Sequence, residues 1–192
     1  MQANKALYFY RSPLNIFQIH YETEEPNLSV CESQRDEFLD ICRGKRKYQE
    51  GKFFCLESRD RFPVDKTIEI IPYFFSEGIL VNESLFFKLK EILKGSGQWI
   101  ECRYNDINYY YFQTSIVLDA IDYEASGCKF IDGYMVSIDP IVFKVIDYGS
   151  TNLFRIPRKE DGKPIWLFAT ELFKNQLEKL GVKNIRFVEA KI

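Results

Sequence analysis

The sequence is poor in the side chains from which catalytic centres and metal sites are usually built. It has a single histidine, His20, and its five cysteines include no C-x-x-C pair. A Cys-His or Ser-His hydrolase would therefore depend on His20, which lies in an alternating apolar segment that is typical of a packed strand. The cysteine spacing also lacks the paired pattern of a zinc site. The sequence accordingly predicts no metal and no cofactor.

Motifs for nucleotides, esters and membranes are missing as well. The chain contains no G-x-G-x-x-G, no Walker loop and no G-x-S-x-G. No run approaches the roughly 18 apolar residues of a membrane helix, and the first residues, MQANKALYFYR, lack the long apolar segment of a secretion signal. An odd number of cysteines also fits free thiols in a reducing compartment. These features predict a cytoplasmic protein that does not enter a membrane.

The chain also lacks a strong net charge. The formal net charge of -2 argues against a direct nucleic-acid binder, which needs a basic face to displace counterions from phosphates. The charges are nevertheless unevenly distributed, because residues 105–150 hold seven acids against two bases and residues 151–192 hold nine bases against five acids. These two regions either attract each other or offer a charged docking face to a partner.

The chain does contain many aromatic residues and an internal repeat. Its 17 phenylalanines and 12 tyrosines predict a packed, sheet-rich interior. The stretch IWLFATELFKNQLEKLGVKNIRFV at 165–188 has the pattern of a strand, a helix that stops at Gly181, and a second strand. A similar pattern, ILVNESLFFKLKEIL, begins at Ile79 and continues into a strand at Ile100. One strand-helix-strand unit is therefore predicted to occur twice.

The remaining pattern is dominated by strands. A further helix is expected at 29–43, and residues 99–145 suggest a meander of antiparallel strands. Other strands are expected at 6–10, 15–21, 53–56, 67–73, 115–121 and 141–146. Residues 152–156 are expected to form a strand or a short turn of helix. The predicted fold class is α+β, with a curved mixed, mainly antiparallel sheet, two or three packed helices and the repeated unit. Residues 1–192 form a single domain in this interpretation, either undivided or with two lobes at 1–98 and 99–192.

Three carboxylates gather where an expected strand ends, namely Asp119, Asp122 and Glu124. Such a cluster suits a divalent cation or a general acid and base, and it is the basis of one alternative, a carboxylate-dependent hydrolase. Solvation of an ordinary turn is the other interpretation. Side chains that converge in a deep pocket would favour the enzyme, whereas an open turn would favour a binding protein.

Consecutive tyrosines at 109–111 form a second candidate site. Successive residues of a strand face opposite ways, so Tyr109 and Tyr111 share one surface. Core packing explains them, and so does exposure at a protein interface, where tyrosine is enriched. The sequence leaves both interpretations open.

Several segments together resemble immunity-protein family eleven of bacterial polymorphic-toxin systems. They are IDYEASGCKF at 121–130, NLFRIPR at 152–158, LGVKNIRFVEA at 180–190 and the helix pattern that begins at Ile79. The positions that match the family motifs are Asp122, Ser126, Phe154, Arg155, Gly181, Arg186 and Phe187. The family usually has a second glycine before the last strand, where this chain has Lys183 and Asn184. The likeness spans residues 71–190.

The resemblance implies an α+β cytoplasmic protein that binds and neutralises a cognate protein toxin and catalyses no reaction. Such an inhibitor needs anchor residues and charge rather than a nucleophile. The partner-binding residues expected in the acidic, tyrosine-rich region are Asp119, Asp122, Glu124, Asp132, Tyr109, Tyr111, Tyr123 and Tyr134. Their acids would imitate phosphates if the toxin were a nuclease with a basic cleft. A structural protein-interaction module is a further alternative.

Overall fold

The computed structural model describes residues 15–21, 28–58, 69–71, 77–132, 134–183 and 185–190. The strand expected at 6–10 lies outside these residues, and so does most of the one expected at 67–73. In chain order the described elements are β1 (Ile16–Tyr21), β2 (Leu28–Val30), α1 (Glu32–Cys42), β3 (Phe53–Ser58), β4 (Ile70–Ile71), β5 (Ile79–Asn82), α2 (Glu83–Ile92), β6 (Gly97–Tyr104), β7 (Ile107–Thr114), β8 (Cys128–Ile131), β9 (Tyr134–Ile138), β10 (Leu153–Pro157), β11 (Pro164–Thr170), α3 (Glu171–Leu180) and β12 (Ile185–Glu189). None of the helices among them is both long and apolar enough to cross a membrane.

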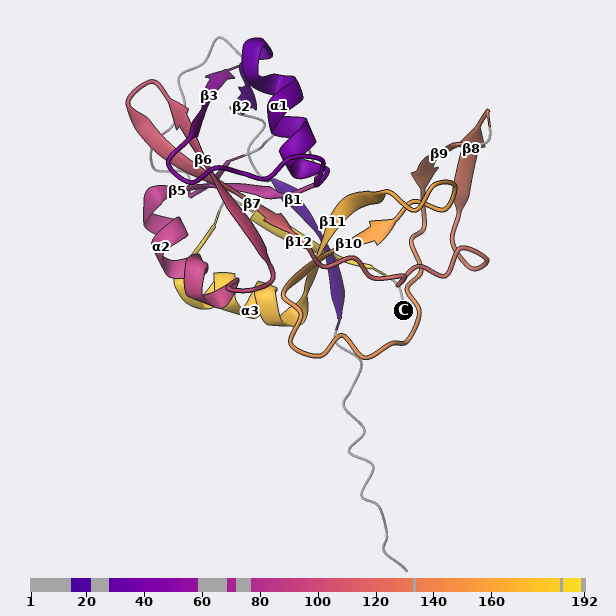
Figure 1. Ribbon diagram of the computed structural model, residues 1–192. Helices are drawn as coiled ribbons and strands as arrows, with labels where there is room; N and C mark the ends of the chain where they lie inside the picture. The colour runs from indigo at the N-terminus through magenta and orange to yellow at the C-terminus, as the bar shows by residue number, and fades with distance from the viewer. Residues whose placement is uncertain are drawn as a thin grey trace, which may run out of the picture.

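The strands form two sheets and a separate hairpin (Figure 1). One sheet has the order β10-β11-β1-β12, and the other has the order β2-β3-β6-β7-β5-β4. Neighbouring strands run antiparallel except for β3 and β6, which run parallel. The predicted class, α+β with a mixed and mainly antiparallel sheet, is therefore confirmed.

The repeated strand-helix-strand unit is present, and each copy has a third strand inserted into it. β5 and β6 both pair antiparallel with β7, which lies between them. β11 and β12 both pair antiparallel with β1 in the same way. Each helix therefore connects two parallel strands across an antiparallel one. The inserted strand follows the unit in the first copy, whereas it comes from the start of the chain in the second.

Local sequence explains how the two repeated helices begin and end. The Asn82 side-chain oxygen accepts a hydrogen bond from the Leu85 amide at 2.9 Å, which caps α2. α3 ends at Gly181, whose φ of 76° is the left-handed conformation that glycine adopts without strain. Equivalent positions of the two helices are buried, with Leu85 and Leu89 matching Phe173 and Leu177.

Both helices pack into one core, and the opposite faces of the two sheets are covered separately. α2 and α3 lie side by side on the same side of the molecule (Figure 1), and their buried faces belong to one cluster with residues from both sheets. α1 covers the other face of the six-stranded sheet. The chain between β7 and β10 covers the other face of the four-stranded sheet with Ala120, Ile121, Phe143 and Tyr148.

The middle of the chain differs from the expected meander. Residues 115–121 and 141–146 form no continuous strands, and only isolated bridges, Val117 to Arg155 and Ile121 to Phe143, remain there. Their apolar side chains cover a sheet instead of alternating between two faces of one. The helix expected at 29–43 is shorter, because residues 28–30 pair with β3 as β2.

Candidate functional site

The β8–β9 hairpin projects from the body of the protein on the side away from α2 and α3 (Figure 1). It exposes large apolar side chains, since Phe130 is 46% exposed, Ile131 61% and Val136 50%. Met135 points inward and is buried. Asp132 lies in the turn with a φ of 51° and is exposed. The hairpin therefore exposes apolar side chains on both of its faces, because Phe130 and Ile131 are successive strand residues, and it carries an acid at its tip.

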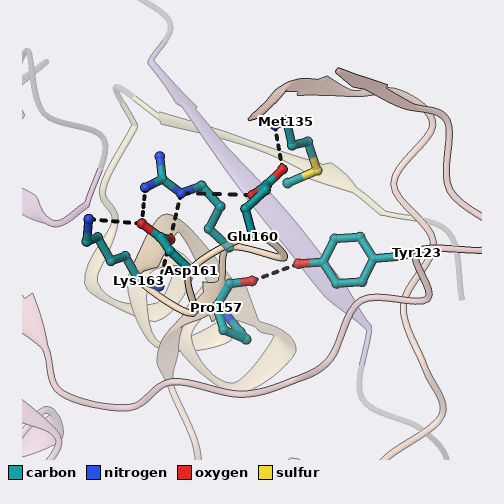
Figure 2. A network of polar contacts seen from close by, with 7 residues as sticks. Tyr123, Met135, Pro157, Glu160, Asp161 and Lys163 are labelled. Atoms are coloured by element: carbon teal, nitrogen blue, oxygen red, sulfur yellow. Dashed lines mark hydrogen bonds and ion pairs between the residues drawn. The ribbon is translucent and has the colours of Figure 1, made fainter. Parts of the chain in front are cut away.

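Backbone hydrogen bonds hold the base of this hairpin. The Gly127 amide donates to the Pro140 carbonyl, and the Asp139 amide donates to the Gly127 carbonyl, each at 2.9 Å. Further along, the Met135 amide donates to Glu160 Oε1 at 2.5 Å (Figure 2). Glu160 belongs to the loop between β10 and β11. The hairpin is thus fixed both at its base and from the side.

The β10–β11 loop is held in shape by its own charges (Figure 2). Asp161 accepts hydrogen bonds from the Arg158 guanidinium, and its carboxylate lies 2.9 Å from Lys163 Nζ. The Arg158 hydrogen bond, followed by that of Lys163, lowers the pKa of Asp161 well below its usual range. This ion-paired loop keeps Glu160 directed at β9.

Tyr123 connects the acidic turn to the same loop. Its hydroxyl donates to the Pro157 carbonyl at 2.7 Å (Figure 2), and Lys159 Nζ lies 5.5 Å from the centre of its ring. Lys159 Nζ also lies 5.9 Å from the ring of Phe130 on the hairpin. Burial, followed by the nearby charge of Asp119, raises the pKa of Tyr123 to about 12. Tyr123 therefore supports the candidate surface from the side.

The three predicted carboxylates make separate contacts. Asp119 Oδ2 lies 2.9 Å from Lys144 Nζ. Asp122 Oδ1 accepts the amides of Glu124 and Ala125, each at 3.0 Å, and so closes a turn. Glu124 itself is exposed. Within the described ranges, no group of three or more histidine, cysteine or acidic side chains is placed to hold a metal ion. The arrangement is an open turn.

The prediction that Tyr109 and Tyr111 contact a partner is wrong. They do share a face of β7, but that face lies under α1, and their exposed fractions are only 1% and 0%. The ring of Tyr111 lies 5.2 Å from that of Phe38 on α1. Tyr110 faces the other way and stacks on Phe86. The side chain of Tyr134 lies outside the described residues.

The positions that match the family motifs are spread over the four-stranded sheet and its cover. Ser126 Oγ accepts the Val142 amide at 2.9 Å beside the Asp122 turn. Phe154 is buried, and the ring of Phe187 packs edge-on against that of Phe17. Arg186 is exposed on β12. Gly181 ends α3, as described above. These residues shape the sheet rather than meeting at one site.

Arg155 differs from the other motif positions because it is a buried cation beside a pocket. The pocket has a volume of about 820 Å³ and lies between the end of α1 and the strands β10 and β11. Sequence patterns did not indicate it, since its lining residues come from distant segments. The only sequence signal was the excess of bases in residues 151–192.

The described geometry defines two surface features, a projecting apolar hairpin with acids around it and a basic pocket. Comparison with known proteins adds no identification, because the chain matches no family model and no curated protein.

Replacing Tyr123 with phenylalanine tests how the turn is attached to the β10–β11 loop. Loss of the bond to the Pro157 carbonyl is expected to lower the free energy of unfolding by about 1 kcal/mol. The pKa of Tyr123 in the folded protein, about 12, exceeds the ordinary tyrosine pKa of about 10. The contribution of Tyr123 to the free energy of unfolding is therefore fully present below pH 10 and falls as the pH rises towards 12. Urea unfolding at pH 7 to 11 measures both effects, and equal pH slopes for the two proteins would contradict the assignment.

Proposed function

We propose that the chain is a non-catalytic immunity protein that binds and neutralises a protein toxin, with the β8–β9 hairpin as its docking surface. The observation that carries this proposal is the exposure of Phe130, Ile131 and Val136 together on a projecting element. Exposed apolar patches with polar surroundings are typical of protein interaction sites. The segment resemblance to an immunity-protein family supports the same class.

The charge around the hairpin favours a basic partner surface. Residues 119–139, which include the hairpin, hold five acids against one base, Lys129, and Lys159 adds a second base beside Phe130. Glu124 and Asp132 are exposed next to and at the tip of the hairpin. Complementary charge speeds association and selects partners. A toxin with a basic face, such as the cleft of a nuclease, fits this surface best.

The contacts of the acidic turn support binding rather than catalysis. The Asp122 carboxylate accepts hydrogen bonds from two backbone amides, and Asp119 is paired with Lys144. A general acid and base need carboxylates that reach a common substrate atom. An open turn whose acids have separate partners is better suited to meeting the charges of another protein.

The double substitution Phe130→Asp with Ile131→Asp tests the proposal. Both side chains are largely exposed, so the fold should tolerate the change. We expect binding to the toxin domain encoded beside the chain's own gene to weaken by more than about tenfold, because central apolar anchors dominate interface energies. Titration calorimetry measures the affinity, and growth of bacteria that express the toxin measures protection.

Phe87→Asp is the matched control. Phe87 is 58% exposed, but it lies on α2, away from the hairpin (Figure 1). This variant should bind and protect like the unsubstituted chain. If the double hairpin variant and the unsubstituted chain bound the toxin domain with equal affinity, the hairpin would be excluded as the docking surface. Failure of the unsubstituted chain to bind or protect would remove the immunity function.

A further inference from the structure

The basic pocket is lined in part by the β10–β11 loop and by no residue of the β8–β9 hairpin. Its volume of about 820 Å³ falls within the range of roughly 300 to 1,000 Å³ that is typical of small-molecule sites. The charged residues that line it are Arg43, Lys45, Glu77, Arg155, Arg158 and Lys163. Five of these six side chains are cationic. The pocket is therefore suited to a negatively charged molecule.

Arg155 is the buried cation of this pocket. It is only 7% exposed, and its Nη1 atom lies 3.5 Å from Glu77 Oε2. Its Nε atom is also buried, and no hydrogen-bond acceptor reaches it within the described part of the chain. A buried donor on a charged group is costly when it is left unpaired. Among the described residues, Glu77 is the acid that is paired with Arg155.

The neighbouring acids neutralise some of the cations but not all. Lys45 lies 3.4 Å from Asp40, and Arg158 and Lys163 share Asp161. Arg43 has no ion pair among the described residues. Glu77 is thus the acid that balances Arg155 and Arg43 together, and one carboxylate cannot neutralise two guanidinium groups. Burial raises the pKa of Glu77, and the charge of Arg155 opposes that rise.

The wall that Gln113 and Thr114 form is held in place by its own hydrogen bonds. The buried Gln113 side chain donates to the Cys42 carbonyl and accepts from Gln98 Nε2 at 3.2 Å. Thr114 Oγ1 donates to the Leu153 carbonyl at 3.0 Å, which ties the end of β7 to β10. The pocket is therefore formed before any ligand enters, and pre-organisation lowers the cost of binding.

A bulge between β10 and β11 lies directly beside Arg155. The pairing shifts between Arg155 and Ile156, and Trp166 on β11 adopts a φ of 44°. Bulges redirect side chains and often occur next to functional sites. A bulky residue with positive φ is a rare conformation that its surroundings must enforce. This local strain is consistent with a requirement to place Arg155 at the pocket.

We infer that the pocket binds a small organic oxyanion, whose phosphate or carboxylate group pairs with Arg155 and Arg43. A guanidinium group presents two parallel donors that match either oxyanion. The described lining residues include no aromatic ring on which a nucleobase could stack. The proposed ligand is a small aliphatic molecule that carries a phosphate monoester or two carboxylates. This site is independent of the toxin-binding proposal.

Titration calorimetry with glucose 6-phosphate, inorganic phosphate and succinate, at matched ionic strength, tests the inference and separates the two oxyanions. We expect one class to bind at a 1:1 ratio with a Kd below about 1 mM. Binding by both phosphates alone assigns a phosphate site, and binding by succinate alone assigns a carboxylate site. Absence of binding by all three probes below about 10 mM would overturn the inference.

Three variants locate the binding in the pocket. Arg155→Met should weaken it by about tenfold or more, and so should Arg43→Gln, whose exposed position lets the test proceed if the Arg155 variant does not fold. Glu77→Gln should instead strengthen binding severalfold, because the carboxylate that competes for Arg155 is removed. Binding that neither Arg43→Gln nor Glu77→Gln alters would place the anion elsewhere and refute the site.

Discussion

Replacing Phe173 with alanine is expected to lower the free energy of unfolding by about 3 to 5 kcal/mol. Phe173 lies on α3 and has no exposed surface. Its cluster also contains Leu85 and Leu89 of α2 and apolar residues of both sheets. A cavity at this position would remove contacts between the two repeated units, and rigid strands on two sides limit how far the neighbours can close it. Urea unfolding followed by far-ultraviolet circular dichroism measures the change.

Phe87→Ala provides the comparison, because it removes the same side chain from the other repeated helix. Phe87 is 58% exposed, so its removal should change the free energy of unfolding by no more than about 0.5 kcal/mol. If the Phe173 and Phe87 variants lost similar stability, α3 would not pack into the shared core as described.

The repeated unit could be predicted from sequence because its signals are local. Asn82 before one helix, Gly181 after the other and apolar residues at helical spacing are all readable within about 20 residues. The equivalent positions Leu85 and Phe173 are both buried. Short-range periodicity thus specified both helices and their buried faces.

The strand inserted into the second copy could not be predicted in the same way, because its partners are distant in the chain. β1 pairs with β11 and β12, so residues 16–21 contact residues 168–170 and 185–189. An alternating pattern shows that a segment can be a strand, but it does not name the neighbouring strand. The division into two sheets depends on these long-range pairs.

The tyrosines of β7 show a related limit. Alternation correctly placed Tyr109 and Tyr111 on one face. Whether that face is covered depends on α1, which is far away in sequence and packs Phe38 against Tyr111. Burial of a strand face is a tertiary property.

The basic pocket could not be predicted from the sequence either, because it too depends on tertiary structure. Arg43, Glu77 and Arg155 come from three separate segments, and none of them lies in a recognisable motif for anion binding. The acidic turn was easier to find, because Asp119, Asp122 and Glu124 are close in sequence. Proximity in sequence did not bring these carboxylates to one point, since Asp122 accepts the amides of its own turn and Asp119 pairs with Lys144.

Replacing Gly127 with alanine is expected to release the β8–β9 hairpin from its base. A Cβ atom on Gly127 would lie 2.0 Å from the Asp139 carbonyl oxygen and 2.7 Å from its carbon. Because both are backbone atoms, the two chain segments must separate, and two hydrogen bonds of 2.9 Å are lost. At about 1 kcal/mol each, this loss should speed hydrogen exchange of the Asp139 amide by about 30-fold. Toxin binding should weaken with it, because Phe130 and Ile131 lose their fixed position.

Glu124→Ala is the control in the same turn, since the Glu124 side chain is exposed and no backbone atom needs to move. It should leave exchange of the Asp139 amide unchanged. Unchanged exchange in the Gly127 variant would show that this contact does not hold the hairpin. Fast exchange with full toxin affinity would leave the structural assignment intact but remove the hairpin from the interface. Faster exchange of the Asp139 amide together with weaker toxin binding in the Gly127 variant, while exchange in the Glu124 variant stays unchanged, would connect the glycine at the hairpin base to recognition of the partner.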